Sequence, residues 1–270
     1  MLRKTAAHVV AVFVVLLCGV MPVWAKEVVV AGSGSCLAIV HVLASEFARI
    51  HPEIRFSIPA SIGSAGGIKA AADGAIEIGV VSRPLKDDEA RLGLVYQQFA
   101  QAIVVLAVNQ NVVDRDIKST ELSDIYRGIK TSWKNGPKII VLTREPQDSS
   151  IMILRNNIPG FGAAYDFSWR KKLWATLFTY QEMNDYLSKT PNSIGISDLG
   201  SIAIEKLKVR PLRIDGIEPD IRAVKNGSYS LVLPYAFVYR AKHLSTEART
   251  FLDFVSSAQG KKILSKYNYM

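Results

Sequence analysis

The regular alternation of short apolar strands with helices constrains the fold of this chain most strongly. Residues 28–31 form a β-branched run, and residues 36–50 carry apolar side chains at helical spacing. A strand at 54–58, a helix at 68–75 and a strand at 76–81 follow. This βαβαβ order predicts a parallel sheet with crossover helices.

The same alternation continues to the end of the chain. Further strands are predicted at 102–108, 138–142, 193–196 and 231–239, and further helices at 119–126, from 151 onward, and at 180–187, 246–256 and 258–267. Ser119 or Thr120 is the expected cap of the helix at 119–126. No repeat, low-complexity stretch or flexible linker interrupts the pattern, so strands must join any two domains.

Residues 1–25 have the features of a secretory signal peptide. Arg3 and Lys4 precede an unbroken apolar run at 9–17, and Val23-Trp24-Ala25 offers a cleavage site. The run is shorter than the roughly 20 residues that span a bilayer as a helix. We therefore expect a periplasmic or secreted protein. One alternative is a retained N-terminal anchor. Another is lipidation at Cys18, which the bulky side chain of Leu17 disfavours.

The charge of the chain is compatible with anionic partners. Loss of Arg3 and Lys4 reduces the 33 Lys and Arg residues to 31, against 24 Asp and Glu, for a net charge of +7. No basic run exceeds residues 170–172, so nucleic-acid binding is not expected. Cys36 is then the one cysteine left, so no internal disulfide is expected, and a small buried side chain is its simplest role.

Three polar turns combine glycine with serine or arginine. They lie at residues 32–35, 62–67 and 144–150, each after a predicted strand. Such turns meet at the carboxyl edge of a parallel sheet, where backbone N–H groups, helix N-termini and hydroxyls can hold an oxyanion. Arg83 and Arg144 add forked donors suited to two oxygens. Each turn alone also fits an ordinary helix cap, but three of them predict an anion site.

The order of these motifs resembles the phosphate-binding periplasmic proteins of ABC transporters. The resemblance spans nearly the whole mature chain, and the segments that carry it are residues 31–33, 63–69, 77–85, 122–128 with Trp133, 194–196 and 251–260. The Gly-Ser-x-Gly-Gly and Ile-Tyr-x-Gly…Trp motifs are fairly specific in combination.

The resemblance implies an α/β protein with the two-lobed type II periplasmic-binding-protein-like fold. Each lobe would be a mixed sheet flanked by helices, and two hinge strands near 102–108 and 231–239 would join them. Lobe I would comprise residues 26–104 plus 234–270, and lobe II residues 105–233. The implied function is capture of phosphate or a similar oxyanion for an ABC importer, by a monomer without cofactor, metal or catalytic activity that docks on the importer's permease.

The ligand residues implied by the resemblance come from four segments between the lobes. They are Ser33, Gly34, Ser35, Ser64, Ser82, Arg83, Arg144, Asp148, Ser149 and Ser150.

The fourth segment departs from the family pattern. Gln147-Asp148-Ser149-Ser150 stands where the family has Gly-Ser-Gly-Thr. Asp148 either caps the helix that starts at Ser149, or accepts the proton of a monoprotonated ligand, so that phosphate or arsenate binds and sulfate does not. A third possibility is another ligand, or none. Arg83 has an alternative role in an ion pair with Asp87 or Asp88.

Two other classes of function compete with transport. A secreted sensory or interaction protein would use the same fold without a transporter. A phosphate-ester hydrolase would need metal ligands or an activated nucleophile. His41, His51 and His243 lie far apart in the sequence, and no base is evident for Ser33 or Ser35. Tyr126 and Trp133 are expected to pack in the core of the second lobe.

Overall fold

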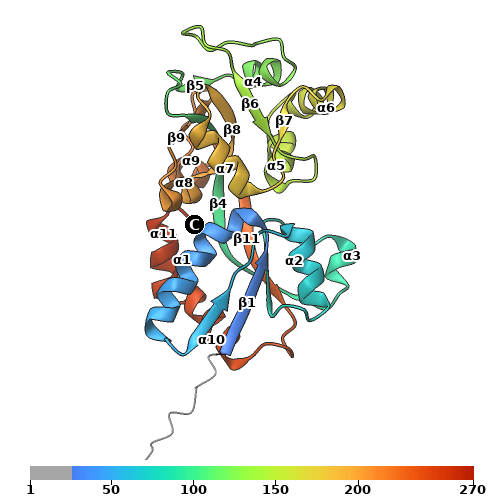
Figure 1. The fold of residues 1–270 in the computed structure, drawn as a ribbon, viewed down its shortest axis with the longest axis vertical. Coiled ribbons are helices and arrows are strands. Elements are labelled where there is room, and N and C mark those ends of the chain that lie inside the picture. Colours follow the sequence, from blue (N-terminus) through green and yellow to red (C-terminus); the bar gives the residue numbers. More distant parts are fainter. Residues whose placement is uncertain (1–25) are drawn as a thin grey trace, which may run out of the picture.

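The computed structural model describes residues 26–270, which form a lower and an upper group of elements (Figure 1). The strands are β1 (Lys26–Gly32), β2 (Ile54–Ser57), β3 (Ile78–Val81), β4 (Val95–Asn109), β5 (Asp116–Ile117), β6 (Ile140–Thr143), β7 (Ala175–Thr176), β8 (Ser193–Asp198), β9 (Val209–Pro211), β10 (Arg213–Ile214) and β11 (Val232–Tyr239). The helices are α1 (Gly34–Ile50), α2 (Gly63–Ala72), α3 (Asp87–Ala90), α4 (Ser119–Tyr126), α5 (Ser149–Asn157), α6 (Phe161–Lys171), α7 (Tyr180–Lys189), α8 (Leu199–Glu205), α9 (Ile221–Lys225), α10 (Thr246–Ser256) and α11 (Ala258–Lys266). The expected signal peptide lies outside the described residues.

The lower group contains the predicted βαβαβ unit. β1 pairs in parallel with both β2 and β3, giving the order β2-β1-β3 with α1 and α2 as crossovers. The C-terminal helices α10 and α11 complete this group (Figure 1). The carboxyl ends of β1 and β3 therefore lie side by side and face the upper group.

Two antiparallel strands, β4 and β11, connect the two groups. β11 pairs with β3, and with β4 from Val95 to Ile103. Beyond Ile103 the same β4 strand pairs with β8 and β9 of the upper group. One sheet path thus runs β2-β1-β3-β11-β4-β8-β6-β7, and the long strand β4 pairs with strands of both groups.

The upper group has a smaller mixed sheet covered by helices α4 to α9 (Figure 1). β6 is parallel to β8 and to β7, whereas β8 is antiparallel to β4. Tyr126 and Trp133 are buried here, as predicted, and Cys36 is fully buried in the lower group. Burial raises the pKa of the Cys36 thiol, which fits a core residue and not a nucleophile.

Several predicted boundaries were wrong. α2 begins at Gly63, five residues before the predicted start at 68, and its first turns include Gly67, which packs closely against the sheet. A Cβ on Gly67 would lie 2.9 Å from Gly32 Cα, so the helix sits directly on β1. The cap of α4 is Lys118, not Ser119 or Thr120. Helix α6 was not predicted at all.

No helix within residues 26–270 is long and apolar enough to cross a membrane.

Candidate functional site

A cavity of about 630 Å³ lies where the two groups face each other. It is bounded by the segments that follow β1, β3 and β6 and by the starts of α1, α2 and α5. All ten residues expected from the sequence line this one cavity: Ser33, Gly34, Ser35, Ser64, Ser82, Arg83, Arg144, Asp148, Ser149 and Ser150.

Serine hydroxyls from four segments form a connected cluster in the cavity wall. Ser33 Oγ lies 2.8 Å from Ser82 Oγ and 3.1 Å from Ser35 Oγ. Ser64 Oγ accepts a hydrogen bond from the Ser82 backbone N–H at 3.2 Å. Ser82 Oγ donates to Ser149 Oγ at 3.1 Å, which joins the lower group to the upper one. Because hydroxyls both donate and accept, this cluster can reorient toward an anion without leaving a buried group unpaired.

The helices α1 and α2 begin at the cavity, and the residue before each of them makes no capping hydrogen bond with its side chain. The residue before α1, Ser33, makes no capping bond, since its hydroxyl joins the serine cluster instead. The residue before α2 is Ile62, which has no polar side chain with which to cap, although the first N–H of α2, on Gly63, donates to Ser61 Oγ at 3.3 Å. Helix N-termini leave backbone donors unsatisfied and carry a partial positive charge. Both helices therefore offer neutral donors to an anion in the cavity.

Arg144 is held by Asp148 on the opposite wall. Its Nε and Nη2 donate to Asp148 Oδ2 at 3.0 and 2.6 Å, and its Nη1 donates to the Leu177 carbonyl at 2.8 Å. Asp148 Oδ1 accepts from the Ser150 backbone N–H at 2.9 Å and from the Ser150 hydroxyl. Asp148 is therefore the cap of α5, as one of the two interpretations predicted.

The same contacts bear on the alternative role for Asp148. A carboxylate has about four acceptor positions, and Arg144 and Ser150 fill them. For Asp148 to accept a proton from a ligand, one of these bonds has to break. Arg144 keeps two of its five N–H donors unpaired in this arrangement.

Arg83 forms a paired fork with Glu89, and the predicted alternative partners Asp87 and Asp88 were wrong. Its Nη1 and Nη2 donate to the two Glu89 oxygens at 2.6 and 2.7 Å. These hydrogen bonds hold the pKa of Glu89 below its usual value. The sequence could not identify the partner, because α3 is a single turn that presents Glu89 to the strand end while both aspartates face solvent.

Sequence reasoning missed two charged residues in the cavity wall, Lys86 and Glu145. Lys86 is exposed, whereas Glu145 follows Arg144 directly and is half-buried. No hydrogen bond or ion pair involves its side chain within residues 26–270. Its neighbours Arg144 and Asp148 neutralise each other, so Glu145 limits the net positive charge that the cavity offers to an anion.

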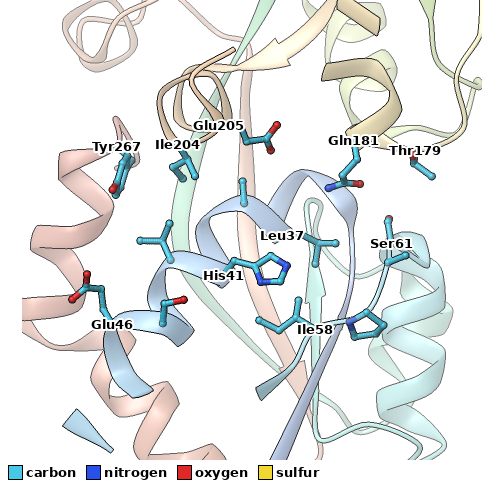
Figure 2. A pocket seen from close by; sticks show the side chains of 15 residues that line it. Leu37, His41, Glu46, Ile58, Ser61, Thr179, Gln181, Ile204, Glu205 and Tyr267 are labelled. Atoms are coloured by element: carbon cyan, nitrogen blue, oxygen red, sulfur yellow. The ribbon is translucent and has the colours of Figure 1, made fainter. Parts of the chain in front are cut away.

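Figure 2 shows the side chains that line a second cavity, of about 640 Å³. Ser61 lines both cavities, and Gln181 of α7 donates to the Gly34 carbonyl of α1 at 3.0 Å between them. A Cβ on Gly34 would lie 3.0 Å from Gln181 Oε1 and from Ser61 Oγ, so this close contact depends on glycine. The contact is a second direct bond between the lower and upper groups.

Comparison with known proteins identifies the family. A model described as the PBP superfamily domain matches residues 24–259 of the chain. The chain belongs to the PBP superfamily. Phosphate-binding protein PstS of Bacillus subtilis (strain 168) is 26% identical, over 89% of this chain and 79% of that protein. PstS of Staphylococcus epidermidis (strain ATCC 12228 / FDA PCI 1200) is 27% identical, over 85% and 74%.

Solved structures of the PBP superfamily confirm the predicted two-lobed α/β fold. A phosphate ABC transporter substrate-binding protein from Clostridium perfringens, solved with bound phosphate, is 26% identical with a TM-score of 0.77. It covers 91% of this chain, which in turn covers 99% of it. An ABC-type phosphate transport receptor from Vibrio cholerae, 22% identical with a TM-score of 0.63 over 90% and 99% of the chains, shares the fold.

A buried carboxylate lies behind the cavity of this PBP-superfamily chain. Asp198, at the end of β8, is fully buried and accepts from Tyr180 Oη at 2.7 Å and Tyr269 Oη at 3.1 Å. It also caps α8 through the Ser201 N–H at 2.8 Å. Tyr269 comes from the C-terminal segment and Tyr180 lines the cavity. The hydrogen bond from Tyr269 to Asp198 thus fixes the C-terminal segment. It joins residues that are 71 positions apart in the sequence, so local periodicity cannot reveal it.

The hydrogen-bond network around Asp198 predicts a specific pH dependence of stability. Burial raises the pKa of the Asp198 carboxyl above its unfolded value, more than its hydrogen bonds lower it. Its contribution to stability is therefore fully present below the unfolded pKa of about 3.9, and it is lost as pH rises through the folded pKa.

We expect the wild type to lose stability relative to Asp198→Asn as pH rises from about 4 to 8. Urea denaturation of both proteins across that range measures the difference. Subtracting the two curves removes the opposite contribution of carboxyls such as Glu89, whose pKa is lowered. Parallel curves would contradict the prediction.

Proposed function

We propose that this chain is an extracytoplasmic solute-binding protein that captures phosphate or a similar oxyanion for an ABC importer. The observation that carries the proposal is the convergence of hydroxyls and uncapped helix N-termini in one cavity between the two groups of elements. Neutral donors of this kind suit a small oxyanion, because they need no full charge to hold it. Phosphate in the related protein from Clostridium perfringens supports this ligand class.

We also propose which residues bind the ligand, which segments move, and what the partner is. The ten residues named above bind the ligand, and residues 26–104 with 234–270 move as one lobe against residues 105–233. The partner is the permease of an ABC importer, and the protein acts as an exported monomer. It is a binding protein and not an enzyme: the hydroxyls of Ser33 and Ser35 bond to other serines, and among residues 26–270 no histidine or carboxylate activates them.

Ligand-dependent melting tests the proposal. The purified protein is unfolded and refolded to remove bound ligand, and melting curves are recorded with phosphate, arsenate, sulfate, molybdate and nitrate. A hundredfold excess over Kd stabilises by about 2.7 kcal/mol, which raises Tm by roughly 5–10 °C in a chain of this size. The absence of a shift with every oxyanion would reject the proposal.

A matched pair of serine variants makes the test specific to the cavity. Ser82→Ala removes the hydroxyl that bonds Ser33 and Ser149, and we expect phosphate affinity to fall roughly tenfold. Ser193→Ala removes an equally buried hydroxyl that bonds the Leu187 carbonyl far from the cavity. It is expected to leave phosphate affinity unchanged.

A further inference from the structure

The cavity is larger than a bare oxyanion requires. A volume of about 630 Å³ falls within the range of roughly 300–1,000 Å³ that holds drug-sized organic ligands. An inorganic phosphate, a phosphorus atom with four oxygens, would occupy only a small part of it. The volume does not arise from separated walls, because Ser82 contacts Ser149 and Gln181 contacts Gly34 across the cavity edges.

The lining of the cavity is divided into a polar and an apolar part. Besides the serines and arginines, it includes three large apolar side chains that are well exposed: Ile62 at 47%, Met152 at 39% and Phe178 at 65%. Single exposed apolar side chains are common on protein surfaces. Three around one concave site, contributed by both the lower and the upper group, indicate a surface that contacts a partner or ligand.

Each apolar side chain is close in sequence to a polar anchor of the anion site. Ile62 directly precedes the start of α2, whose second residue is Ser64. Met152 lies one helical turn after Ser149 on α5. Phe178 follows Leu177, whose carbonyl accepts from Arg144. All three side chains line the same cavity as those anchors, so an apolar group bonded to an oxyanion held there would lie beside them.

We propose that the cleft accepts an organic phosphate, that is, a phosphate monoester or a phosphonate with an apolar substituent. The oxyanion head binds the serine cluster and the N–H groups at the starts of α1 and α2. The substituent packs on Ile62, Met152 and Phe178, and its burial adds affinity that inorganic phosphate cannot gain. This inference rests on the proposed function and specifies its ligand class.

Two phosphonates that differ in their apolar substituent test the inference. Isothermal titration of the purified protein gives Kd for methylphosphonate, phenylphosphonate and inorganic phosphate. Neither phosphonate carries a cleavable ester, so hydrolysis does not affect the comparison. We expect phenylphosphonate to bind at least about tenfold more tightly than methylphosphonate, which corresponds to about 1.4 kcal/mol.

Variants assign that advantage to the apolar side chains. Phe178→Ser and, separately, Met152→Ser should reduce the ratio of the two phosphonate Kd values to about two. Phe167→Ser is the control, because Phe167 has a 39% exposed ring on α6 and does not line the cavity. It should leave the ratio unchanged. A melting curve of each variant verifies that it is folded.

The outcomes separate this inference from the proposed function. If all three ligands bind and the phosphonates bind equally well, the inference is overturned while oxyanion capture stands. If phenylphosphonate binds more tightly but Phe178→Ser and Met152→Ser keep the ratio, the apolar subsite lies elsewhere and the inference as stated is wrong. If none of the three binds, both the inference and the proposed function fail.

Discussion

Replacing Arg144 by alanine is expected to lower the free energy of unfolding by about 3 kcal/mol and to abolish oxyanion binding. Arg144 is 6% exposed, and its pair with Asp148 is shielded from water, with 14% of the Asp148 side chain exposed. Removing one partner of a buried ion pair leaves an uncompensated charge, which costs about 3–5 kcal/mol. Asp148 retains its bonds from Ser150, which places the expected loss at the lower end.

The loss of binding has a separate cause. Without Arg144, Asp148 and Glu145 leave two uncompensated carboxylates at the cavity wall, and an anion is repelled by both. Urea denaturation measures the stability change, and titration with phosphate at a temperature where the variant is folded measures binding.

The pair formed by Arg155 and Asp166 provides a matched control. It also has two hydrogen bonds, from Arg155 Nη1 and Nη2 to the two Asp166 oxygens at 2.6 and 3.1 Å, but Asp166 is 49% exposed. Exposed pairs contribute about 0–1 kcal/mol, so Arg155→Ala should cost little and leave phosphate binding intact. An Arg144→Ala variant that is no less stable than Arg155→Ala would show that the buried pair does not behave as argued.

The sequence predicted the strands and helices that carry strong periodicity, and missed those whose signal is diluted by exposure. In α6, four side chains are buried at helical spacing: Phe161, Ala164, Tyr165 and Ser168. The exposed aromatic side chains of Phe167 and Trp169 next to them obscure this pattern in the sequence. In β4, the predicted strand covered only the fully buried part. In its first seven residues, Val95 to Gln101, polar and apolar side chains do not alternate regularly and only Ala100 is buried, so this part was missed.

The residues of the candidate site could be predicted because strand ends in a parallel sheet converge, whatever their neighbours. Which of these residues pair with one another could not be predicted. Whether Arg83 pairs with Asp87, Asp88 or Glu89 depends on how a single helical turn is oriented. That the Glu145 side chain lines the cavity without a partner depends on the packing around it, which the sequence does not show. The link from Asp198 to Tyr269 depends on where the C-terminal segment packs, which local sequence patterns do not encode.

Replacing Gly32 by alanine is expected to destabilise the protein by at least about 3 kcal/mol and to prevent phosphate binding. Gly32 ends β1 with φ at +149°, and it lies opposite Val80 of β3 in the parallel pair. A Cβ there would lie 2.0 Å from the Val80 carbonyl oxygen, which is backbone and cannot turn aside as a side chain would. The two strands must separate, or β1 must twist before Ser33.

Either movement displaces the first polar turn. The Ser33 N–H donates to the same Val80 carbonyl at 2.8 Å, and Ser33 Oγ reaches Ser82, so the steric clash acts at the centre of the serine cluster. Backbone clashes and forced φ values are among the few causes of such large destabilisation. Thermal and urea denaturation, followed by phosphate titration of the folded variant, measure both effects.

The control is Gly216→Ala, which separates the cost of backbone conformation from the cost of the clash. Gly216 also has positive φ, at +81°, but a Cβ there meets no atom within 4 Å. The left-handed conformation alone costs roughly 1–2 kcal/mol for a residue with a side chain. If Gly32→Ala costs no more than Gly216→Ala, the close approach of β1 to β3 is not what requires glycine. If it costs markedly more and phosphate binding is lost with it, the first polar turn owes its position to a contact that only glycine permits.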